Sequence, residues 1–227
     1  MKQVKIIVLR ANIAAGKTTL LDRLGRLPSI KKLVEDGVVD FLEEPVQKWT
    51  SFCDKDGISI FELFYNDQAK WSFAFQLFAL STRCRDILEK VESNNNLKVL
   101  VIERSPDDDR FIFAELLHDM GFVNDMELGL IDFHRSVWYN QMSSAIYNTI
   151  YLDVDVEECI SRLKKRSRDG ECGISRDYLA AVQAKTDALF ASDTKGAIRI
   201  NCNCNLDDLE YNKNIDIIGK LITDATI

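Results

Sequence analysis

A phosphate-binding pattern lies near the start of the chain, where residues 8–24 read VLRANIAAGKTTLLDRL. In such a loop, backbone N–H groups and the start of the following helix surround phosphate oxygens, a lysine adds positive charge and Ser or Thr binds magnesium. Lys17 and Thr18 supply these groups. The residues expected to hold a nucleotide are Asn12, Ile13, Ala14, Ala15, Gly16, Lys17, Thr18 and Thr19.

The first position of that pattern is unusual, because Ala11 stands where glycine normally begins the loop. A left-handed backbone at an alanine costs about 1 to 2 kcal/mol, which is small beside a total stability on the order of 5 to 15 kcal/mol. A chance match is the alternative, but a strand before the loop and a helix after it are also indicated. We therefore predict a working nucleotide triphosphate site.

Carboxylates and an arginine follow two other apolar runs, in EEPVQKW (residues 43–49) and ERS (residues 103–105). Beside a triphosphate, a carboxylate can accept a proton from a substrate hydroxyl or bind hydrated magnesium, and an arginine can neutralise the transferring charge. We predict Glu44 as the general base and Glu103 as the magnesium-side carboxylate. A solvated strand end is the usual alternative for a lone glutamate, but two of them beside a phosphate loop favour a catalytic site.

The elements that must position these groups alternate along the chain. Apolar runs predict strands at residues 4–9, 38–42, 98–103, 148–154 and 197–202, and helical periodicity predicts helices at 59–92 (broken near 65–68), 108–119, 125–145, 176–190 and 206–222. Such alternation predicts an α/β fold of three layers, the P-loop NTPase fold, with a five-stranded parallel sheet flanked by helices. Its ligands gather at the carboxyl ends of the strands.

Composition sets further bounds. With 227 residues and 46% hydrophobic residues, we expect one compact domain over residues 1–227. The net charge of −7 argues against nucleic acid or an anionic membrane as a partner. The apolar N-terminal run is too short to span a bilayer, and no cleavage site follows it, so we expect a cytoplasmic protein. The six cysteines are scattered, so we expect reduced thiols. His118 and His134 have no second ligand nearby, which predicts packing or surface roles.

Several segments together carry a more specific signal: ANIAAGKTT, EEPVQKW, FELFYNDQAKWSFAFQ, ERSPDDDR and RLKKRSRDGEC. In this order and spacing they resemble the deoxyribonucleoside kinase family, which includes deoxycytidine, deoxyguanosine and insect-type multisubstrate kinases. The resemblance runs from about residue 4 to residue 190. It implies a homodimeric salvage enzyme that uses ATP and Mg²⁺ to phosphorylate the 5′-hydroxyl of a deoxyribonucleoside.

The resemblance also implies individual roles. Glu44 matches the base that takes the 5′-hydroxyl proton, Arg104 the arginine that holds that hydroxyl, and Thr18 and Glu103 the magnesium side. Tyr65 and Glu171 match a pair that binds the sugar 3′-hydroxyl. The predicted substrate-binding residues are Glu44, Trp49, Phe64, Tyr65, Phe75, Gln76, Ala79, Arg83, Arg104, Asp109, Phe113 and Glu171, with core packing as the alternative for Phe75 and Phe113.

The segment RLKKRSR (residues 162–168) places five positive charges on an acidic chain. A solvated face is the ordinary interpretation of such a run. The resemblance matches it to a lid at about 162–173 that closes over ATP, in which Arg162, Arg166 and Arg168 reach the phosphates. Arg162 and Arg166 join Lys17, Glu44 and Arg104 as the predicted catalytic residues.

The choice of base is predicted from one helix. Gln76, Ala79 and Arg83 share a helical face. In the family the glutamine pairs with the base edge, and Arg83 and Asp109 fall where deoxycytidine and deoxyguanosine kinases have an arginine and its aspartate partner. Such a pair fills the space of a thymine methyl, so we expect deoxypurine nucleosides or deoxycytidine rather than thymidine. The alternative is an Arg83 solvated on the outer face.

Two departures from the family and two other functions stay open. Arg10 replaces an acidic residue often found before the loop, and SPDDD after Arg104 is unusually acidic. The chain could instead be a nucleoside monophosphate kinase of the thymidylate kinase type, although that acceptor needs extra arginines. It could also be an inactive nucleotide-binding structural subunit, although the retained Lys17, Glu44 and Glu103 argue against this.

Overall fold

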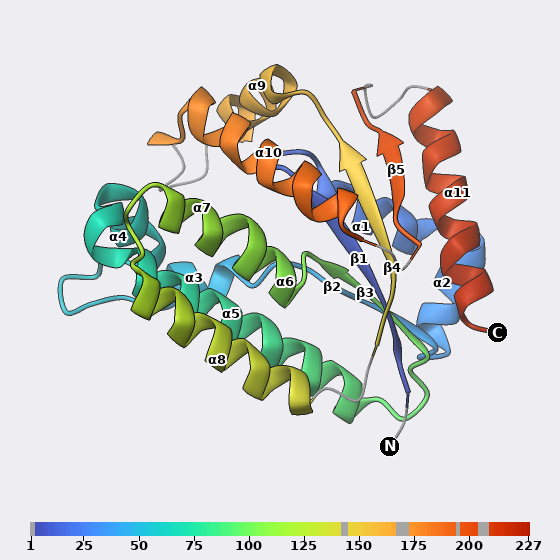
Figure 1. Ribbon diagram of the computed structural model, residues 1–227. Helices are drawn as coiled ribbons and strands as arrows, with labels where there is room; N and C mark the ends of the chain where they lie inside the picture. The colour runs from blue at the N-terminus through green and yellow to red at the C-terminus, as the bar shows by residue number, and fades with distance from the viewer. Residues whose placement is uncertain (1–2, 142–144, 167–172, 194–195, 204–208) are drawn as a thin grey trace.

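A parallel sheet forms the centre of the molecule (Figure 1). The computed structural model describes residues 3–141, 145–166, 173–193, 196–203 and 209–227, and of residues 145–147 only the backbone. The strands are β1 (Lys5–Ala11), β2 (Val39–Leu42), β3 (Val99–Glu103), β4 (Ala145–Asp153) and β5 (Ile198–Asn201), in the order β2-β3-β1-β4-β5. All four pairings are parallel, which confirms the predicted α/β fold.

Burial explains why these segments are strands. Every residue of β3 is buried, and so is every residue of β1 after Lys5, because helices cover both faces of the sheet. β1 pairs with β3 as far as Leu9↔Glu103, and with β4 as far as Ala11↔Leu152. The carboxyl ends of the central strands therefore lie side by side, which brings the phosphate loop next to Glu103 and Arg104.

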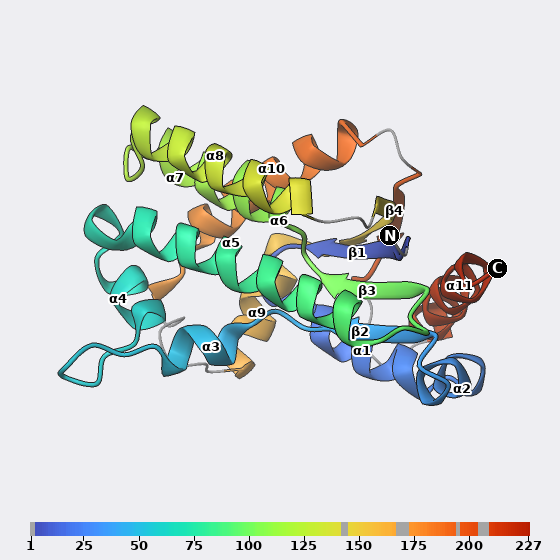
Figure 2. The ribbon, with the colours of Figure 1, turned by 90° about the horizontal axis from the view of Figure 1, so that it is seen from below.

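Helices form a layer on each side of the sheet (Figures 1 and 2). One layer holds α1 (Lys17–Arg26), α2 (Pro28–Glu35) and α11 (Leu209–Ala225). The other holds α5 (Gln68–Ser93), α10 (Arg176–Ala191) and a continuous helical run of α6 (Pro106–Asp108), the π-helical turn η1 (Asp109–Ala114) and α7 (Glu115–Asp119). Outside α5 lies α8 (Asp125–Gln141), and α3 (Val46–Ser51), α4 (Ile60–Asn66) and α9 (Val156–Arg166) complete the described helices.

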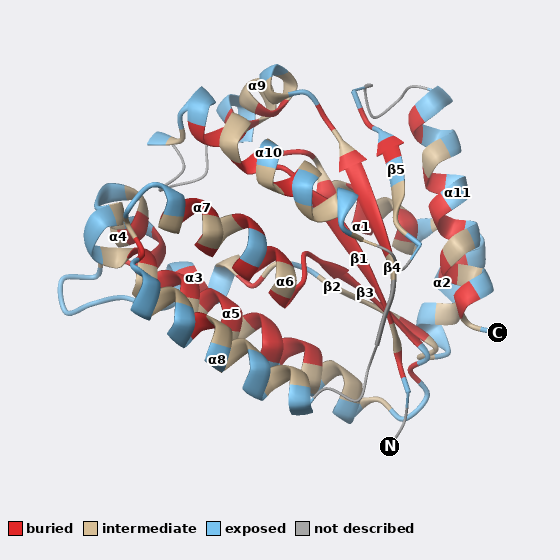
Figure 3. Ribbon diagram, in the orientation of Figure 1, coloured by how far each residue is buried: buried red, intermediate tan, exposed pale blue. Residues whose placement is uncertain are grey.

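Of the three apolar clusters in the described residues, the smallest includes Val8, Ile87 and Leu100 and packs the sheet against α5. The largest lies between the sheet and its helices and includes Ile7, Leu24, Val101 and Leu152. The third lies among the helices beyond the sheet edge and contains Phe64, Phe75, Leu80, Leu117 and Ile131. Figure 3 shows the sheet buried between the layers and the outer face of α8 exposed. In the described part of the chain, no helix is both long and apolar enough to cross a bilayer.

The predicted helix boundaries are right in one place and wrong in another. The expected break near residues 65–68 is confirmed, since Asp67 separates α4 from α5 and its side chain accepts a hydrogen bond from the Lys70 N–H at 3.2 Å. The helix predicted over 125–145 is too long, because α8 ends at Gln141 and β4 begins at Ala145 to pair with Lys5. Helices α2 and α3 were not predicted.

Candidate active site

The phosphate loop joins β1 to α1 without a glycine at its start. Ala11 is the last residue of β1 and pairs with Leu152, and it has no positive φ, so the backbone cost considered for it does not arise. The left-handed residues of the loop are instead Ala14, with φ 60°, and Gly16, with φ 96°. A left-handed alanine costs about 1 to 2 kcal/mol. The strained position of this loop is therefore Ala14, and Gly16 supplies the second turn of the backbone.

Lys17 is held inside the loop. Its Nζ donates a hydrogen bond to the Asn12 carbonyl at 3.0 Å, and its side chain lines the central cavity. Burial lowers the pKa of Lys17 to about 8, with Arg104 acting in the same direction and Glu103 and Glu44 acting against it. Lys17 is therefore mainly protonated at neutral pH and can meet an anion.

Asn12 shapes the loop from behind. Its Nδ2 donates to the Leu179 carbonyl at 3.0 Å and to Gln183 Oε1 at 2.9 Å, and its Oδ1 accepts from the Ile13 N–H at 2.8 Å. Neither Asn12 nor Ala15 lines the cavity, whereas Ile13, Ala14, Gly16, Lys17, Thr18 and Thr19 do. The side chain of Asn12 thus anchors the loop to α10 and points away from the cavity.

Glu103 connects the phosphate loop to the segment after β2 that carries Glu44. Thr18 Oγ1 donates to Glu103 Oε1 at 2.8 Å, and the Glu44 N–H donates to Glu103 Oε2 at 3.2 Å. The Glu103 side chain is buried at the end of β3. One carboxylate therefore fixes the distance between the loop hydroxyl and the backbone of the candidate base.

Glu44 lies between two arginines. Its Oε1 accepts hydrogen bonds from Arg104 Nη1 at 2.7 Å and from Arg83 Nη2 at 3.1 Å, and no donor among the described residues reaches Oε2. Burial alone would raise the pKa of Glu44, but Arg104, Arg83 and Lys17 outweigh it and hold that pKa at about 2. Glu44 is ionised at neutral pH, with one oxygen available for a ligand.

Arg104 adopts a backbone conformation that is rare for its residue type. Its φ is 60°, and its N–H donates to the Leu9 carbonyl at 3.0 Å. Its guanidinium Cζ lies 4.5 Å from the ring centre of Phe113. Strained backbone of this kind costs on the order of 1 to 3 kcal/mol and is concentrated at functional sites. The turn at Arg104 directs its side chain to Glu44.

Arg83 and Asp109 form the ion pair predicted for them. Arg83 Nε lies 2.7 Å from Asp109 Oδ2 and Nη2 lies 3.1 Å from Oδ1, while Nη1 donates to the Glu103 carbonyl at 2.6 Å. Burial would lower the pKa of Arg83, but Asp109 and Glu44 raise it above its usual value. Arg83 is only 2% exposed, so the solvated alternative is wrong. Asp109 lines the cavity and Arg83 supports it from behind.

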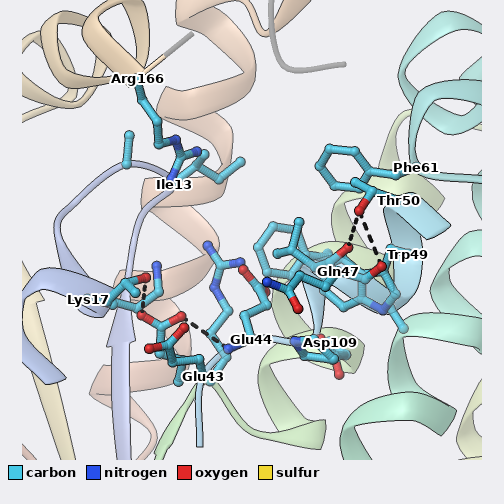
Figure 4. A pocket seen from close by; sticks show the side chains of 18 of the residues that line it. Ile13, Lys17, Glu43, Glu44, Gln47, Trp49, Thr50, Phe61, Asp109 and Arg166 are labelled. Atoms are coloured by element: carbon cyan, nitrogen blue, oxygen red, sulfur yellow. Dashed lines mark hydrogen bonds and ion pairs between the residues drawn. The ribbon is translucent and has the colours of Figure 1, made fainter. Parts of the chain in front are cut away.

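These groups surround one cavity of about 1130 Å³ (Figure 4). Aromatic rings form its wall away from the phosphate loop. Phe64 and Phe75 stack with their ring centres 4.5 Å apart, and Trp49 meets Phe75 edge-on with the ring centres 5.4 Å apart. Tyr65 and Phe113 also line it, as does Ala79. The amide of Gln76 is 3% exposed, faces this cavity and has no hydrogen-bond partner among the described residues.

Of the predicted lid at about 162–173, the structure describes residues 162–166, which end α9, and residue 173. Arg162 donates to Glu158 Oε1 at 2.8 Å, to the Ala15 carbonyl at 2.9 Å and to the Cys202 carbonyl at 3.1 Å, so it fastens α9 to the phosphate loop. Arg166 extends into the cavity from the end of α9 (Figure 4). Arg168 and Glu171 lie outside the described residues.

The comparison with known families decides what this arrangement belongs to. A model of the deoxynucleoside kinase family matches residues 7–221. The chain belongs to the deoxynucleoside kinase family. The resemblance inferred from the motifs is therefore confirmed over nearly the whole chain, and the protein is an ATP-dependent phosphotransferase that acts on deoxynucleosides.

Named relatives agree with this assignment. The chain is 32% identical to human (Homo sapiens) deoxycytidine kinase over 207 residues, which cover 82% of this chain and 75% of the relative. It is 32% identical to deoxycytidine kinase 1 of Xenopus laevis over 203 residues, covering 81% and 72%. It is 27% identical to the mitochondrial deoxyguanosine kinase of Xenopus laevis over 209 residues, covering 85% and 75%.

Sequence reasoning missed several residues that line the cavity of this deoxynucleoside kinase. Gln47 and Phe61 lie within the motifs that carry the family resemblance, so the motifs could have indicated them, and Figure 4 shows both beside Trp49. Glu43 borders the cavity next to Glu44. Tyr178 reaches it from α10, and no motif of the sequence pointed to that residue.

The two departures from the kinase family compensate each other. Arg10 is buried, and its Nε lies 2.8 Å from Asp108 Oδ1, an aspartate of the acidic segment after Arg104. Burial would raise the pKa of Asp108, but Arg10 and the hydrogen bonds from Ser105 lower it. The unusual arginine and the unusual aspartate thus form one buried pair. Of the histidines, His118 contacts Asp125 and His134 contacts Ser81 and Trp138, which agrees with packing roles.

Proposed function

We propose that this deoxynucleoside kinase transfers the γ-phosphate of ATP to the 5′-hydroxyl of a deoxypurine nucleoside or deoxycytidine in nucleotide salvage. The observation that carries the proposal is the position of Glu44, which shares one cavity with Lys17 and has an oxygen not taken by Arg83 or Arg104. A general base must lie within reach of both the attacking hydroxyl and the phosphate site. Glu44 meets that requirement.

Each residue of the site has its own proposed role in the reaction. Lys17 and the backbone of the phosphate loop bind the phosphates of ATP. Arg104 orients Glu44 through Oε1, and Glu44 Oε2 accepts the hydrogen bond of the 5′-hydroxyl and then its proton. With a pKa of about 2, Glu44 is a weak base, so its first task is to aim the hydroxyl at the phosphorus. Arg162 and Arg166 neutralise charge on the phosphates when α9 and the segment after it close.

Magnesium fits the loop side of the cavity. The Thr18 hydroxyl and Glu103 Oε1 are 2.8 Å apart beside Lys17, and this pairing of a loop hydroxyl with a carboxylate suits an oxygen-seeking divalent cation. The described residues contain no group of three or more His, Cys, Asp or Glu that could hold a metal ion by themselves. We therefore propose that Thr18 and Glu103 hold Mg²⁺ together with phosphate and water, and that the ion neutralises phosphate charge.

The preferred base is proposed from the far wall of the cavity. The Gln76 amide offers a donor and an acceptor that no described residue uses. Beside it, Asp109 is fixed by Arg83 and can meet the polar edge of a purine or of cytosine. A thymine methyl would face this ion pair and leave it without solvent, which is unfavourable. Tyr65 and Glu171 are proposed to bind the sugar 3′-hydroxyl, and Trp49, Phe64, Phe75 and Phe113 to pack against the base and sugar.

Neither alternative function is supported by the site. A monophosphate acceptor would need further cations on the sugar side, whereas Arg104 and Arg83 are both committed to Glu44. An inactive subunit would have no reason to keep Lys17, Glu44 and Glu103 around one cavity.

We also propose that the enzyme is a single-domain homodimer that works in the cytoplasm, without nucleic acid or membrane partners. One face of α8 exposes Met126, Leu130, Phe133 and Val137 at helical spacing, which supports a self-association surface. The described cysteines Cys53, Cys84 and Cys159 form no disulfide, as in a reducing compartment. The net charge of −7 disfavours polyanions.

Transfer of labelled γ-phosphate from ATP to the four deoxynucleosides in parallel tests the proposal. We expect labelled 5′-monophosphates of deoxyadenosine, deoxyguanosine or deoxycytidine, the least product with thymidine, and no product with Glu44→Gln. Thymidine as the best acceptor would overturn the base preference. Full activity of Glu44→Gln would overturn the assignment of the base.

A further inference from the structure

Tyr178 borders the catalytic cavity and has no role in the site described so far. It is the third residue of α10, and its backbone N–H donates to the Ser175 hydroxyl that caps the helix, at 3.1 Å. Its side chain is 9% exposed, and the cavity is the space that it faces. The helix cap and the surrounding core fix the direction of the ring.

Tyr178 is linked both to the phosphate loop and to the surroundings of Glu44. The next residue, Leu179, accepts the hydrogen bond from Asn12 of the phosphate loop at 3.0 Å, so this turn of α10 is fastened to the loop. Arg104, the partner of Glu44, lines the same cavity, and its charge acts on the Tyr178 phenol. Burial raises the pKa of the Tyr178 phenol, and the charge of Arg104 acts against this rise. The hydroxyl therefore stays protonated in the neutral range and is a hydrogen-bond donor.

That hydroxyl lacks a partner in the part of the chain that the structure describes. No hydrogen bond joins Tyr178 Oη to any described residue, and the fully enclosed side-chain atoms without partners are others: Arg10 Nη1, Ser72 Oγ, Arg104 Nε and Tyr139 Oη. Tyr178 Oη is therefore open to the cavity. Polar groups that are this deeply buried are nearly always hydrogen-bonded, and the ring alone could be provided by phenylalanine. A ligand in the cavity is the natural acceptor.

We propose that Tyr178 is a further catalytic residue, whose hydroxyl donates a hydrogen bond to an oxygen of the phosphoryl group during transfer. The inference rests on the proposed function of the site. In that reaction the 5′-oxygen forms a bond to the γ-phosphorus while the bond from that phosphorus to the ADP oxygen breaks. The hydroxyl proton passes to Glu44, and Tyr178 keeps its own proton throughout. A fixed neutral donor of this kind stabilises charge that develops in the transition state.

The substitution Tyr178→Phe removes the hydroxyl and keeps the ring. Because a hydrogen bond to a charged group would be lost, we expect kcat to fall about 10- to 100-fold, with little change in KM for ATP or for the deoxynucleoside. Tyr211→Phe is the matched control, since Tyr211 is a buried phenol of α11 outside the cavity. Tyr178→Phe should unfold at the same temperature as the wild type, because no described residue is hydrogen-bonded to its hydroxyl.

A binding measurement separates a catalytic role from a structural one. ADP with aluminium fluoride mimics the transferring group, so the wild type should bind a deoxynucleoside more tightly with ADP and fluoroaluminate than with ADP alone. Tyr178→Phe should lose most of that gain and bind equally with ADP alone. An unchanged kcat, or a loss confined to KM for the deoxynucleoside, would overturn the inference. Activity of Glu44→Gln would instead refute the proposed site and leave a kcat effect of Tyr178→Phe standing.

Discussion

At the scale of single residues, Lys17 and Ala11 have opposite importance although both belong to the phosphate loop. Lys17→Ala removes the buried cation from the phosphate site, and loss of one such group costs about 100- to 1000-fold or more in rate. Ala11→Gly should change the rate little, because Ala11 is an extended strand residue whose φ is not positive. Steady-state phosphorylation of deoxycytidine or deoxyguanosine measures both. An inactive wild type that Ala11→Gly rescues would contradict the prediction.

The pH dependence of ATP use follows from Lys17. Burial favours its neutral form and lowers its pKa to about 8, so the free enzyme loses this charge as the pH rises above that value. We expect kcat/KM for ATP to be level near pH 7 and to fall about tenfold per unit well above pH 8. Glu44, with a pKa of about 2, should add no acidic limb between pH 5 and 7. A steep fall of kcat/KM of the wild type between pH 5 and 7 would show that the pKa of Glu44 is not depressed.

The same shift of Glu44 bears on stability. A carboxylate whose pKa is lower in the folded state contributes stability above its unfolded pKa, here 4.5, and this contribution is lost as the pH falls toward 2. Acid unfolding of wild type and Glu44→Gln in parallel measures it. The stability of Glu44→Gln should depend less on pH between 4.5 and 2.

Base choice depends on Arg83 and Asp109 acting together. Arg83→Met alone leaves Asp109 buried without its partner, which costs about 3 to 5 kcal/mol. The double variant Arg83→Met, Asp109→Ala removes both charges and should gain thymidine activity. It should also lose rate with deoxycytidine, because Glu44 loses one of its two arginine contacts. Values of kcat/KM for the four deoxynucleosides decide the matter, and a double variant still unable to use thymidine would refute the specificity argument.

The sequence predicted the residue types of this site and the Arg83–Asp109 pair, but not its other pairings. Lys17, Thr18, Glu44 and Glu103 fall within motifs that end strands, and the parallel register brings those ends together. The Arg10–Asp108 pair joins positions 98 residues apart, and a single sequence contains no sign that two departures compensate. For the same reason, the attachment of Arg162 to the Ala15 carbonyl could not be predicted from the basic run.

At the scale of elements, α10 supports the phosphate loop from outside the cavity. Asn12 Nδ2 donates to Gln183 Oε1 at 2.9 Å, Gln183 contacts the Tyr151 hydroxyl, and that hydroxyl donates to Asp187 Oδ1 at 3.0 Å. The network runs from the loop through α10 to β4. Since α10 is the helix that follows the predicted lid in the chain, the phosphate loop is held by the segment directly after the lid.

Gln183→Ala tests that support. Asn12 would keep the Leu179 carbonyl but lose its second acceptor, and an unpaired buried donor costs about 1 to 3 kcal/mol. We expect lower thermal stability and a several-fold higher KM for ATP, with KM for the deoxynucleoside unchanged. Gln141→Ala at the exposed end of α8 is the control. Equal effects on both substrates would mean that Gln183 supports the fold in general.

The ends of elements were harder to predict than their existence. Periodicity favours helix through residue 145, yet the chain leaves α8 at Gln141 because the edge of β1 needs a partner strand. The short α3 follows Pro45, which fixes the chain direction after Glu44, and is too short for its periodicity to be recognised. Long-range strand pairing explains the wrong end predicted for α8, and the shortness of α3 explains why that helix was not predicted.

At the scale of the whole molecule, the negative net charge contrasts with a cluster of cations at one cavity, which carboxylates also line. The net charge is −7, but Lys17, Arg83, Arg104, Arg162 and Arg166 are gathered around or behind one cavity. A field that repels polyanions at long range therefore coexists with a local site for a triphosphate. Composition alone predicts the repulsion of polyanions, and only the fold explains the local site for a triphosphate.

One chain supplies Lys17, Glu44, Glu103 and Arg104 around a single cavity, so formation of the proposed dimer and catalysis should be separable. On α8, Phe133 is 68% exposed, and on α11 Ile217 is 54% exposed. Phe133→Glu places a charge in the middle of the apolar face of α8 and should yield monomers in sedimentation velocity, whereas Ile217→Glu should leave the dimer intact. The monomer should keep kcat within a few-fold of the wild type, because α8 does not line the cavity. A Phe133→Glu variant that sediments as the wild type does would place the contact between subunits on another surface.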